Sequence, residues 1–143
     1  MSLYITQEAG FELPANWVDG TVNLLEYTRP EGVIRVGVAR NDRQGKDLAG
    51  CVEERLVEQR RKLPFFELLG RSERLSAGLP AIDVKVTYED AKQKTYQRAL
   101  SFVIGGRFVS LGVTAPLSQQ AEADAIFERA ASTISLRARP SGA

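Results

Sequence analysis

The chain has 143 residues, of which 43% are hydrophobic and 26% are charged. This balance is typical of one folded globular domain, and a chain of this length needs no disulfide or metal to fold. Nineteen basic and eighteen acidic residues leave a formal net charge of +1. Near-neutrality argues against a nucleic-acid-binding protein, because phosphate contacts require a concentrated excess of Lys and Arg.

Residue types that most catalytic and metal sites need are missing. The sequence has no histidine and one cysteine, Cys51, so a Ser-His-Asp triad, a Cys-His nucleophile, a His-ligated metal and a Cys₄ zinc site are excluded. Neither G-x-G-x-x-G nor a phosphate-binding loop occurs. Asp83, Glu89 and Asp90 lie near one another, but their alternation with apolar residues predicts a solvated strand face. We therefore predict no enzyme activity, no cofactor and no metal.

Targeting signals are also missing from the sequence. The start, MSLYITQEAG, lacks the basic and apolar regions of a signal peptide, and no apolar run reaches the length of a membrane span. The single cysteine gives no sign of an oxidising compartment. We therefore expect a cytoplasmic protein that is not itself inserted in a membrane. Residues 1–137 are predicted to form one domain, and residues 138–143 a disordered tail.

The first strands pose a question about burial. A short edge strand is expected near residues 3–6, followed by a turn in FELPANW and a strand, TVNLLEYT, over residues 21–28. Because side chains alternate along a strand, Val22 and Leu24 share one face, while Leu25 and Tyr27 share the other. Both faces therefore carry apolar side chains. One face can pack on a helix, and the second needs another cover.

A half-buried strand and a helix come next. GVIRVGVAR, residues 32–40, alternates like an antiparallel strand, and residues 47–63 show helical spacing that ends before Pro64. The apolar stripe of this helix contains one polar residue, Gln59. Gln59 could lie at the wet end of the stripe, bond a neighbouring loop, or face a site.

Four further strands follow, over residues 66–75, 79–90, 95–105 and 107–116, with Gly105 and Gly106 as a two-residue hairpin turn between the last two. In residues 95–105 one face carries mostly large side chains, and the other carries small or polar residues that include Gln97 and Ala99. The second face leaves space above the sheet.

A second amphipathic helix is expected to begin at Ser118 as its N-cap. Its apolar stripe comprises Ala123, Ile126, Phe127, Ala130 and Ile134. These elements predict an α+β fold: a curved antiparallel sheet of about six or seven strands, with both amphipathic helices packed on one face.

Several short motifs are similar to those of a known family. They are FELPANWVDGTVNLLEYT, the helix containing Gln59, LPAIDVKVTYED, and Tyr96-Gln97-Arg98 before the Gly-Gly hairpin. Together they resemble the DcrB-like family, which includes the EagR chaperones of type VI secretion systems. The resemblance implies a Mog1/PsbP-like fold and a homodimer shaped like a claw.

The resemblance also implies a function. EagR-type chaperones bind and shield the hydrophobic N-terminal transmembrane segments of an effector that carries a PAAR domain, until export. Val22 and Leu24 would then line the partner-binding groove, while Leu25 and Tyr27 would enter the core. A groove with amides could also bond polar groups of such segments, which is the role expected of Gln59 and Gln97. Ala99, on the small face of the same strand as Gln97, completes the expected groove.

Two other functions stay open at this point. A non-catalytic regulatory module of the same fold could bind a soluble partner, and would use a flatter and more charged face. An enzyme would instead show a cleft with strongly perturbed carboxylate pKa values.

Overall fold

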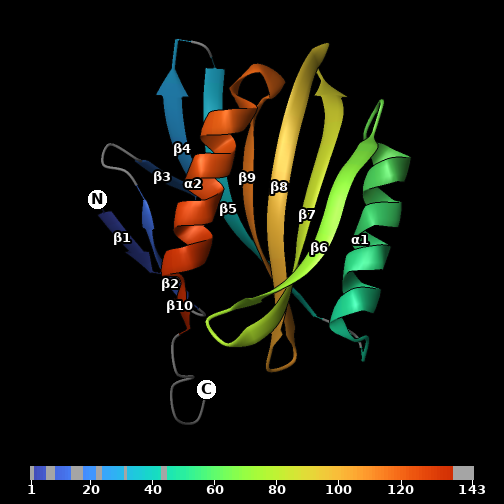
Figure 1. Cartoon of the computed structure of the whole chain (residues 1–143). Coiled ribbons are helices and arrows are strands. Elements are labelled where there is room, and N and C mark those ends of the chain that lie inside the picture. Colours follow the sequence, from blue (N-terminus) through green and yellow to red (C-terminus); the bar gives the residue numbers. More distant parts are fainter. Residues whose placement is uncertain are drawn as a thin grey trace.

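The computed structural model describes residues 2–5, 9–13, 18–21, 24–30, 32–42 and 45–136 (Figure 1). Its helices are α1 (Leu48–Lys62) and α2 (Gln120–Thr133), the latter preceded by the 3₁₀ turn Leu117–Gln119. The strands are β1 (Ser2–Ile5), β2 (Ala9–Leu13), β3 (Val18–Thr21), β4 (Leu24–Arg29), β5 (Gly32–Asp42), β6 (Glu67–Ser76), β7 (Leu79–Asp90), β8 (Gln93–Ile104), β9 (Arg107–Pro116) and β10 (Ser135–Leu136).

Two antiparallel sheets are present in these ranges. The larger has the order β3-β4-β5-β9-β8-β7-β6, and the smaller has the order β1-β2-β10. The five long strands β5 to β9 form the body of the open larger sheet, while the short β4 and β3 extend it beyond β5. The body is therefore smaller than the predicted six or seven strands, and the short edge strands make up the difference. The α+β class with an antiparallel sheet and two helices is confirmed.

The two helices lie on opposite faces of the larger sheet, so the prediction that both pack on one face was wrong. Ala99 pairs with Val84, in the cluster beneath α1, whereas Leu100 pairs with Asp83 and packs in the cluster beneath α2. Neighbouring residues of β8 thus face different helices. The register between strands decides which apolar faces add together, and the sequence of one strand does not reveal it. We call the two faces the α1 face and the α2 face.

The core beneath α2 is the larger of the two. It joins the buried side of α2 to the alternate residues of β8 and β9 that face it. The predicted helical stripe is confirmed, since all five of its residues are buried: Ala123, Ile126, Phe127, Ala130 and Ile134. Ser118 is not the N-cap, however. The helix begins at Gln120 because the 3₁₀ turn takes up Ser118, and Gln119 holds the capping position without a side-chain bond.

The boundaries of α1, one residue inside the predicted range 47–63 at each end, follow from local chemistry. Asp47 is the N-cap, and its Oδ1 accepts a hydrogen bond of 2.8 Å from the backbone N–H of Gly50. The last turn is basic, which suits the negative end of the helix dipole, and Leu63 closes the helix before Pro64. Cys51 lies on the buried side of α1, as expected for a small apolar side chain. No helix in the described ranges is long and apolar enough to cross a membrane.

The β8–β9 hairpin is confirmed, with Gly105 and Gly106 between the two strands. At the other end of the sheet, the predicted strand 21–28 is not continuous. Thr21 ends β3 and pairs with Leu24, the first residue of β4. The predicted turn at Pro14 and the predicted tail 138–143 lie outside the described residues.

Candidate functional site

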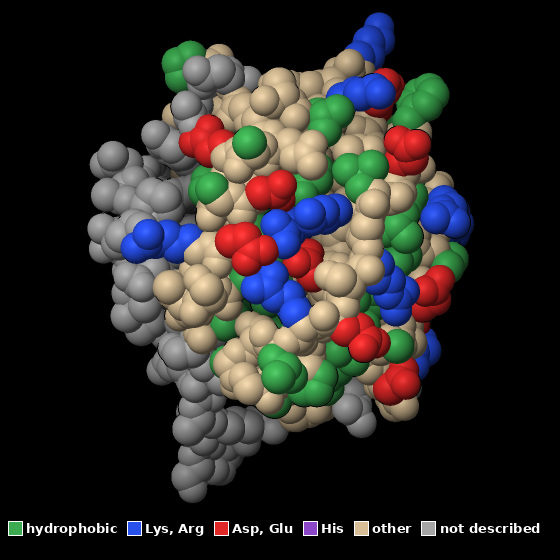
Figure 2. All heavy atoms as spheres, in the orientation of Figure 1, with side chains coloured by type: hydrophobic (Ala, Val, Ile, Leu, Met, Phe, Trp, Pro, Cys, Tyr) green, Lys and Arg blue, Asp and Glu red, His purple; other side chains and the backbone are tan. Residues whose placement is uncertain are grey.

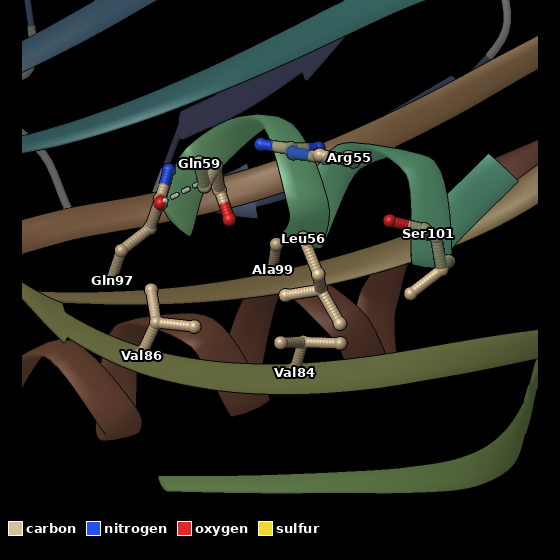
Figure 3. A pocket seen from close by; sticks show the side chains of 9 residues that line it. Arg55, Leu56, Gln59, Val84, Val86, Gln97, Ala99 and Ser101 are labelled. Atoms are coloured by element: carbon tan, nitrogen blue, oxygen red, sulfur yellow. Dashed lines mark hydrogen bonds between the residues drawn. The ribbon is translucent and has the colours of Figure 1, made fainter. Parts of the chain in front are cut away.

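The α1 face carries a hollow between α1 and the sheet (Figure 3). Its cavity volume is about 20 Å³, room for about one water molecule. Its lining comes from three elements, α1, β7 and β8: Val52, Arg55, Leu56, Gln59, Val84, Val86, Gln97, Ala99 and Ser101. A space of this size is far below that of a small-molecule pocket, so it has room at most for the tip of one side chain of a docked segment.

An amide pair closes one end of the hollow. Nε2 of Gln59 donates a hydrogen bond of 3.2 Å to Oε1 of Gln97, joining α1 to β8 across 38 residues of sequence (Figure 3). Gln59 is half-buried, as is Gln97. The polar residue on the apolar stripe therefore bonds the sheet, and not a neighbouring loop. Each amide keeps further donor or acceptor capacity, because this bond uses one group on each side.

Small residues form a row across the α1 face. In this row Gly37 pairs with Gly112, and Gly112 pairs with Ala99 of the hollow. Directly paired residues share a face, so the row continues from the hollow onto β9 and β5. Gly37 and Gly112 are partly exposed. At these two glycines, β5 and β9 thus expose their backbone on the α1 face.

The side chains on both sides of this row are also short. Ala39 pairs with Ser110, and Ser110 pairs with Ser101 at the hollow. The two serine hydroxyls bond each other at 2.8 Å and are buried. On the other side, Thr114 pairs with Gln97. We call this small-residue stretch of the α1 face the trough; the Gln59–Gln97 pair lies beside it, and Nε2 of Gln97 is 3.8 Å from the place of a Cβ at Gly112.

Arg55 adds a cation to the lining of the hollow (Figure 3). Burial lowers the pKa of its guanidinium, although the group stays charged at neutral pH. The hydrogen bonds and ion pairs found among the described residues do not involve its side chain. Arg55 can therefore donate to carbonyl or hydroxyl groups of a docked segment.

Three of the five predicted groove residues come together in the structure. Gln59, Gln97 and Ala99 line one hollow. The backbone of Leu24 pairs with Gly37, which places this position in the small-residue row. Val22 lies outside the described residues.

Sequence reasoning missed Arg55, Gly37 and Gly112. Arg55 is one of many charged residues on α1, and its sequence position does not distinguish it. The two glycines did carry a signal. A glycine inside a strand weakens it and often marks a place where another backbone approaches closely.

The α2 face holds a buried charge network that was also missed. Asp83 was predicted to be solvated, yet it is 5% exposed and bonds Arg98 through two hydrogen bonds of 3.0 and 2.7 Å. The prediction failed because α2 covers this face of β7, so the alternation did not separate core from solvent. Arg98 also donates to Asp124 and Glu128 of α2. Figure 2 shows acidic and basic side chains interleaved on this face of the molecule.

The network shifts several pKa values. Burial is the largest effect on Arg98 and lowers its pKa, but the bond to Asp83 and the surrounding carboxylates together raise it above the ordinary value. Hydrogen bonding to Arg74 lowers the pKa of Glu128. Burial, with the bond to Asp124, raises the pKa of the Tyr96 hydroxyl. These ion pairs connect α2 to the sheet, so they stabilise the packing of the helix on the α2 face.

Solved structures share this fold. A Pseudomonas aeruginosa protein of unknown function, PA94, is 20% identical, with a TM-score of 0.74 over 96% of this chain and 98% of that one. LpqN of Mycobacterium tuberculosis, involved in cell envelope biogenesis, is 14% identical, with a TM-score of 0.68 over 91% and 83%. The cyanobacterial PsbP protein, CyanoP, of Synechocystis is 10% identical, with a TM-score of 0.64 over 95% and 92%. These likenesses confirm the expected PsbP-like fold.

Sequence comparisons add the family. No curated protein matches the chain. The DcrB family model, in contrast, matches residues 8–133, which is most of the chain. The chain therefore belongs to the DcrB family.

Proposed function

We propose that this protein is a chaperone for a type VI secretion effector that carries a PAAR domain. It binds the hydrophobic N-terminal transmembrane segments of the effector on the α1 face, in the cytoplasm, and shields them before export. It acts as a homodimer, without a cofactor and without catalysis. The observation that carries the proposal is the row of Gly37, Gly112 and Ala99 beside the hollow.

A transmembrane segment outside the membrane needs a partner that covers its apolar surface. A membrane helix in water exposes apolar surface, and each Å² that a chaperone covers stabilises the complex by about 25 cal/mol. Membrane helices pack closely where small residues let two backbones approach. Gly37 and Gly112 offer the same opportunity on a sheet, because no side chain stands between the docked helix and the strand backbone.

Polar groups beside the trough support the same partner. Transmembrane helices carry Ser, Thr and other polar groups that bond neighbouring helices in the membrane. Gln59 and Gln97 have free hydrogen-bonding capacity, and Arg55 adds donors. These groups satisfy polar atoms of the segment that would otherwise lose their partners on docking.

The alternative is a regulatory module that binds a folded, soluble protein. The solved PA94 structure is described as a candidate regulator, which keeps this alternative in view. Such a module needs a flat face with charges that match its partner. The small-residue trough favours an apolar helix instead.

Filling the trough with a larger side chain should strongly reduce effector binding without harming the fold. We expect Gly112→Val to reduce the amount of soluble complex with the effector's N-terminal segment to about a tenth, since overpacking a close contact costs 1–3 kcal/mol or roughly tenfold in affinity. The fold should persist, because a Cβ at this position would lie 3.8 Å from Nε2 of Gln97, which is ordinary contact.

The matched control is Gly106→Val, in the exposed β8–β9 turn, where an added Cβ would meet nothing within 4 Å. Co-expression, affinity capture and quantitation of the soluble segment measure both variants. Equal recovery with Gly112→Val and the wild-type protein would contradict the proposed site.

A further inference from the structure

Strand β6 ends the larger sheet, and its outer edge is a row of backbone groups without a strand partner in the described ranges. Exposed strand edges pair readily with other chains, so proteins usually blunt or cover them. β6 is long for an edge strand, with ten residues, and its fully exposed stretch includes leucines. An edge of this kind calls for a specific partner.

Exposed apolar side chains gather at this edge. All five large hydrophobic side chains that are exposed in the described ranges lie on β6, just before it, or on α1: Val57, Phe65, Leu68, Leu69 and Leu75. Phe65 and Leu75 are 78% and 72% exposed. Val57 lies on the side of α1 that turns to β6, because Glu53, one helical turn earlier, bonds Arg71 at 2.8 Å.

The sequence of β6, ELLGRSERLS, is complementary to itself. If two copies pair antiparallel with Ser72 opposite Ser72, Arg71 of one copy lies opposite Glu73 of the other, and the reverse pair also forms. The same register brings Leu75 opposite the Leu68–Leu69 bulge of the second copy. Opposite charges and apolar pairs directly across two strands stabilise the pairing.

We propose that the β6 edge is the interface with a second copy of this chain, paired antiparallel about a two-fold axis at Ser72. Two-fold symmetry suits the observations, because one self-complementary patch then serves both copies. Arg71 can hold both of its partners, since a guanidinium has five N–H donors and Glu53 occupies only part of them.

This arrangement fixes how the two sites lie. Directly opposite residues share a face, so the two α1 faces form one side of a continuous sheet. Both hollows then open on the same side, one in each copy. The interface rests on the homodimer of the proposed function but not on effector binding, and it would let one dimer hold two helices of one effector.

A cysteine at the axis tests the register. In a Cys51→Ala background, Ser72→Cys should give a disulfide-linked dimer in high yield under mild oxidation. Paired Cα atoms across antiparallel strands are about 4.5–5.5 Å apart, within disulfide range. Gly70→Cys is the control on the same edge. Its two copies would be roughly 14 Å apart in this register, so the yield should fall at least fivefold.

Charge reversal tests the pairing in solution. Light scattering of the wild-type protein at micromolar concentration should give about twice 15.7 kDa. Glu73→Arg places like charges opposite each other twice in the dimer, and should raise its dissociation constant at least about tenfold. Arg71→Glu added to Glu73→Arg restores opposite charges and should recover most of the loss.

Three results would overturn the proposal. They are a wild-type mass of 15.7 kDa at all concentrations, equal crosslinking at positions 70 and 72, or a double variant no better than Glu73→Arg. Crosslinking of Ser72→Cys to a different protein in cells, with no dimer, would assign the edge to that protein instead. Light scattering and crosslinking of the purified protein use the chaperone alone, so a failure to bind any effector leaves their outcome unchanged.

Discussion

Replacing Arg98 by methionine should lower the free energy of unfolding by about 3–5 kcal/mol. The Arg98 side chain is 8% exposed and forms the only ion pair of the described residues in which both side chains are nearly fully buried, with Asp83 at 2.7 Å. Its guanidinium also lies over the Phe127 ring, 4.1 Å from the ring centre. Without Arg98, the buried Asp83 carboxylate keeps the more exposed Arg74, at 3.2 Å, as an ion-pair partner. Most of its compensation is then lost, which is far costlier than the pair itself is stabilising.

The control is an exposed ion pair. Arg61 bonds Glu58 on the surface of α1, and Arg61→Met should change stability by less than about 1 kcal/mol. Chemical denaturation of both variants, with circular dichroism as the probe, measures the difference. A loss below 1 kcal/mol for Arg98→Met would mean that the network on the α2 face does not connect the helix to the sheet as described.

Acid should weaken the ion pairs that hold α2 to the sheet. The pKa of Glu128 is lower in the folded protein than in the unfolded chain, because Arg74 and Arg98 stabilise its charged form. This contribution is present above the unfolded pKa, and is lost as pH falls through the folded pKa. Glu128 is partly exposed, so we expect only a modest effect beside that of Arg98→Met.

Two aspartates on neighbouring positions of β4 should have opposite effects. Leu24→Asp should leave stability within about 1 kcal/mol of the wild type and weaken effector binding at least about 100-fold, because docking an apolar helix over an unpaired carboxylate costs several kcal/mol. Leu25→Asp should unfold or aggregate the chain. The backbone of Leu24 pairs with Gly37 of the trough row, while that of Leu25 pairs with Val36, which is buried in the α2 core.

Each aspartate is the control for the other. Thermal melts measure the fold, and capture of the effector's N-terminal segment measures binding. If Leu24→Asp unfolds the protein while Leu25→Asp is benign, the two faces of β4 are assigned the wrong way round. If both unfold it, position 24 belongs to the core and the segment binds elsewhere.

Local patterns in the sequence predicted the elements well. β7 and β9 have the predicted limits, and the stripe of α2 is buried as expected. Alternation and turn residues are local signals, so they need no knowledge of neighbouring strands. The small second face of β8 was also recognised from alternation alone.

What the sequence could not give is the arrangement across strands. The pairing of Val84 with Ala99 decides that the apolar side of β7 and the small side of β8 face α1 together. A shift of one residue would reverse this choice, and no feature within either strand specifies it. The misplacement of Asp83 has the same origin, because its partner Arg98 comes from the next strand.

Part of the candidate site could be predicted from the sequence, for similar reasons. Gln59 was conspicuous as a polar residue on an apolar stripe, whereas its bond to Gln97 depends on the fold. The resemblance to a family supplied the partner-binding role of these residues. Gly37 and Gly112 meet across β5 and β9, and only the register turns two separate glycines into one row.

Co-expression of this chain with the N-terminal segment of its proposed PAAR effector tests the central claim most directly. We predict that the segment, found in the membrane or in aggregates when expressed alone, will elute with this protein as one soluble complex containing two copies of the chain. Gly112→Val should reduce that complex to about a tenth, while Gly106→Val should retain it. A segment that stays in membranes or aggregates in the presence of this folded protein would contradict the account.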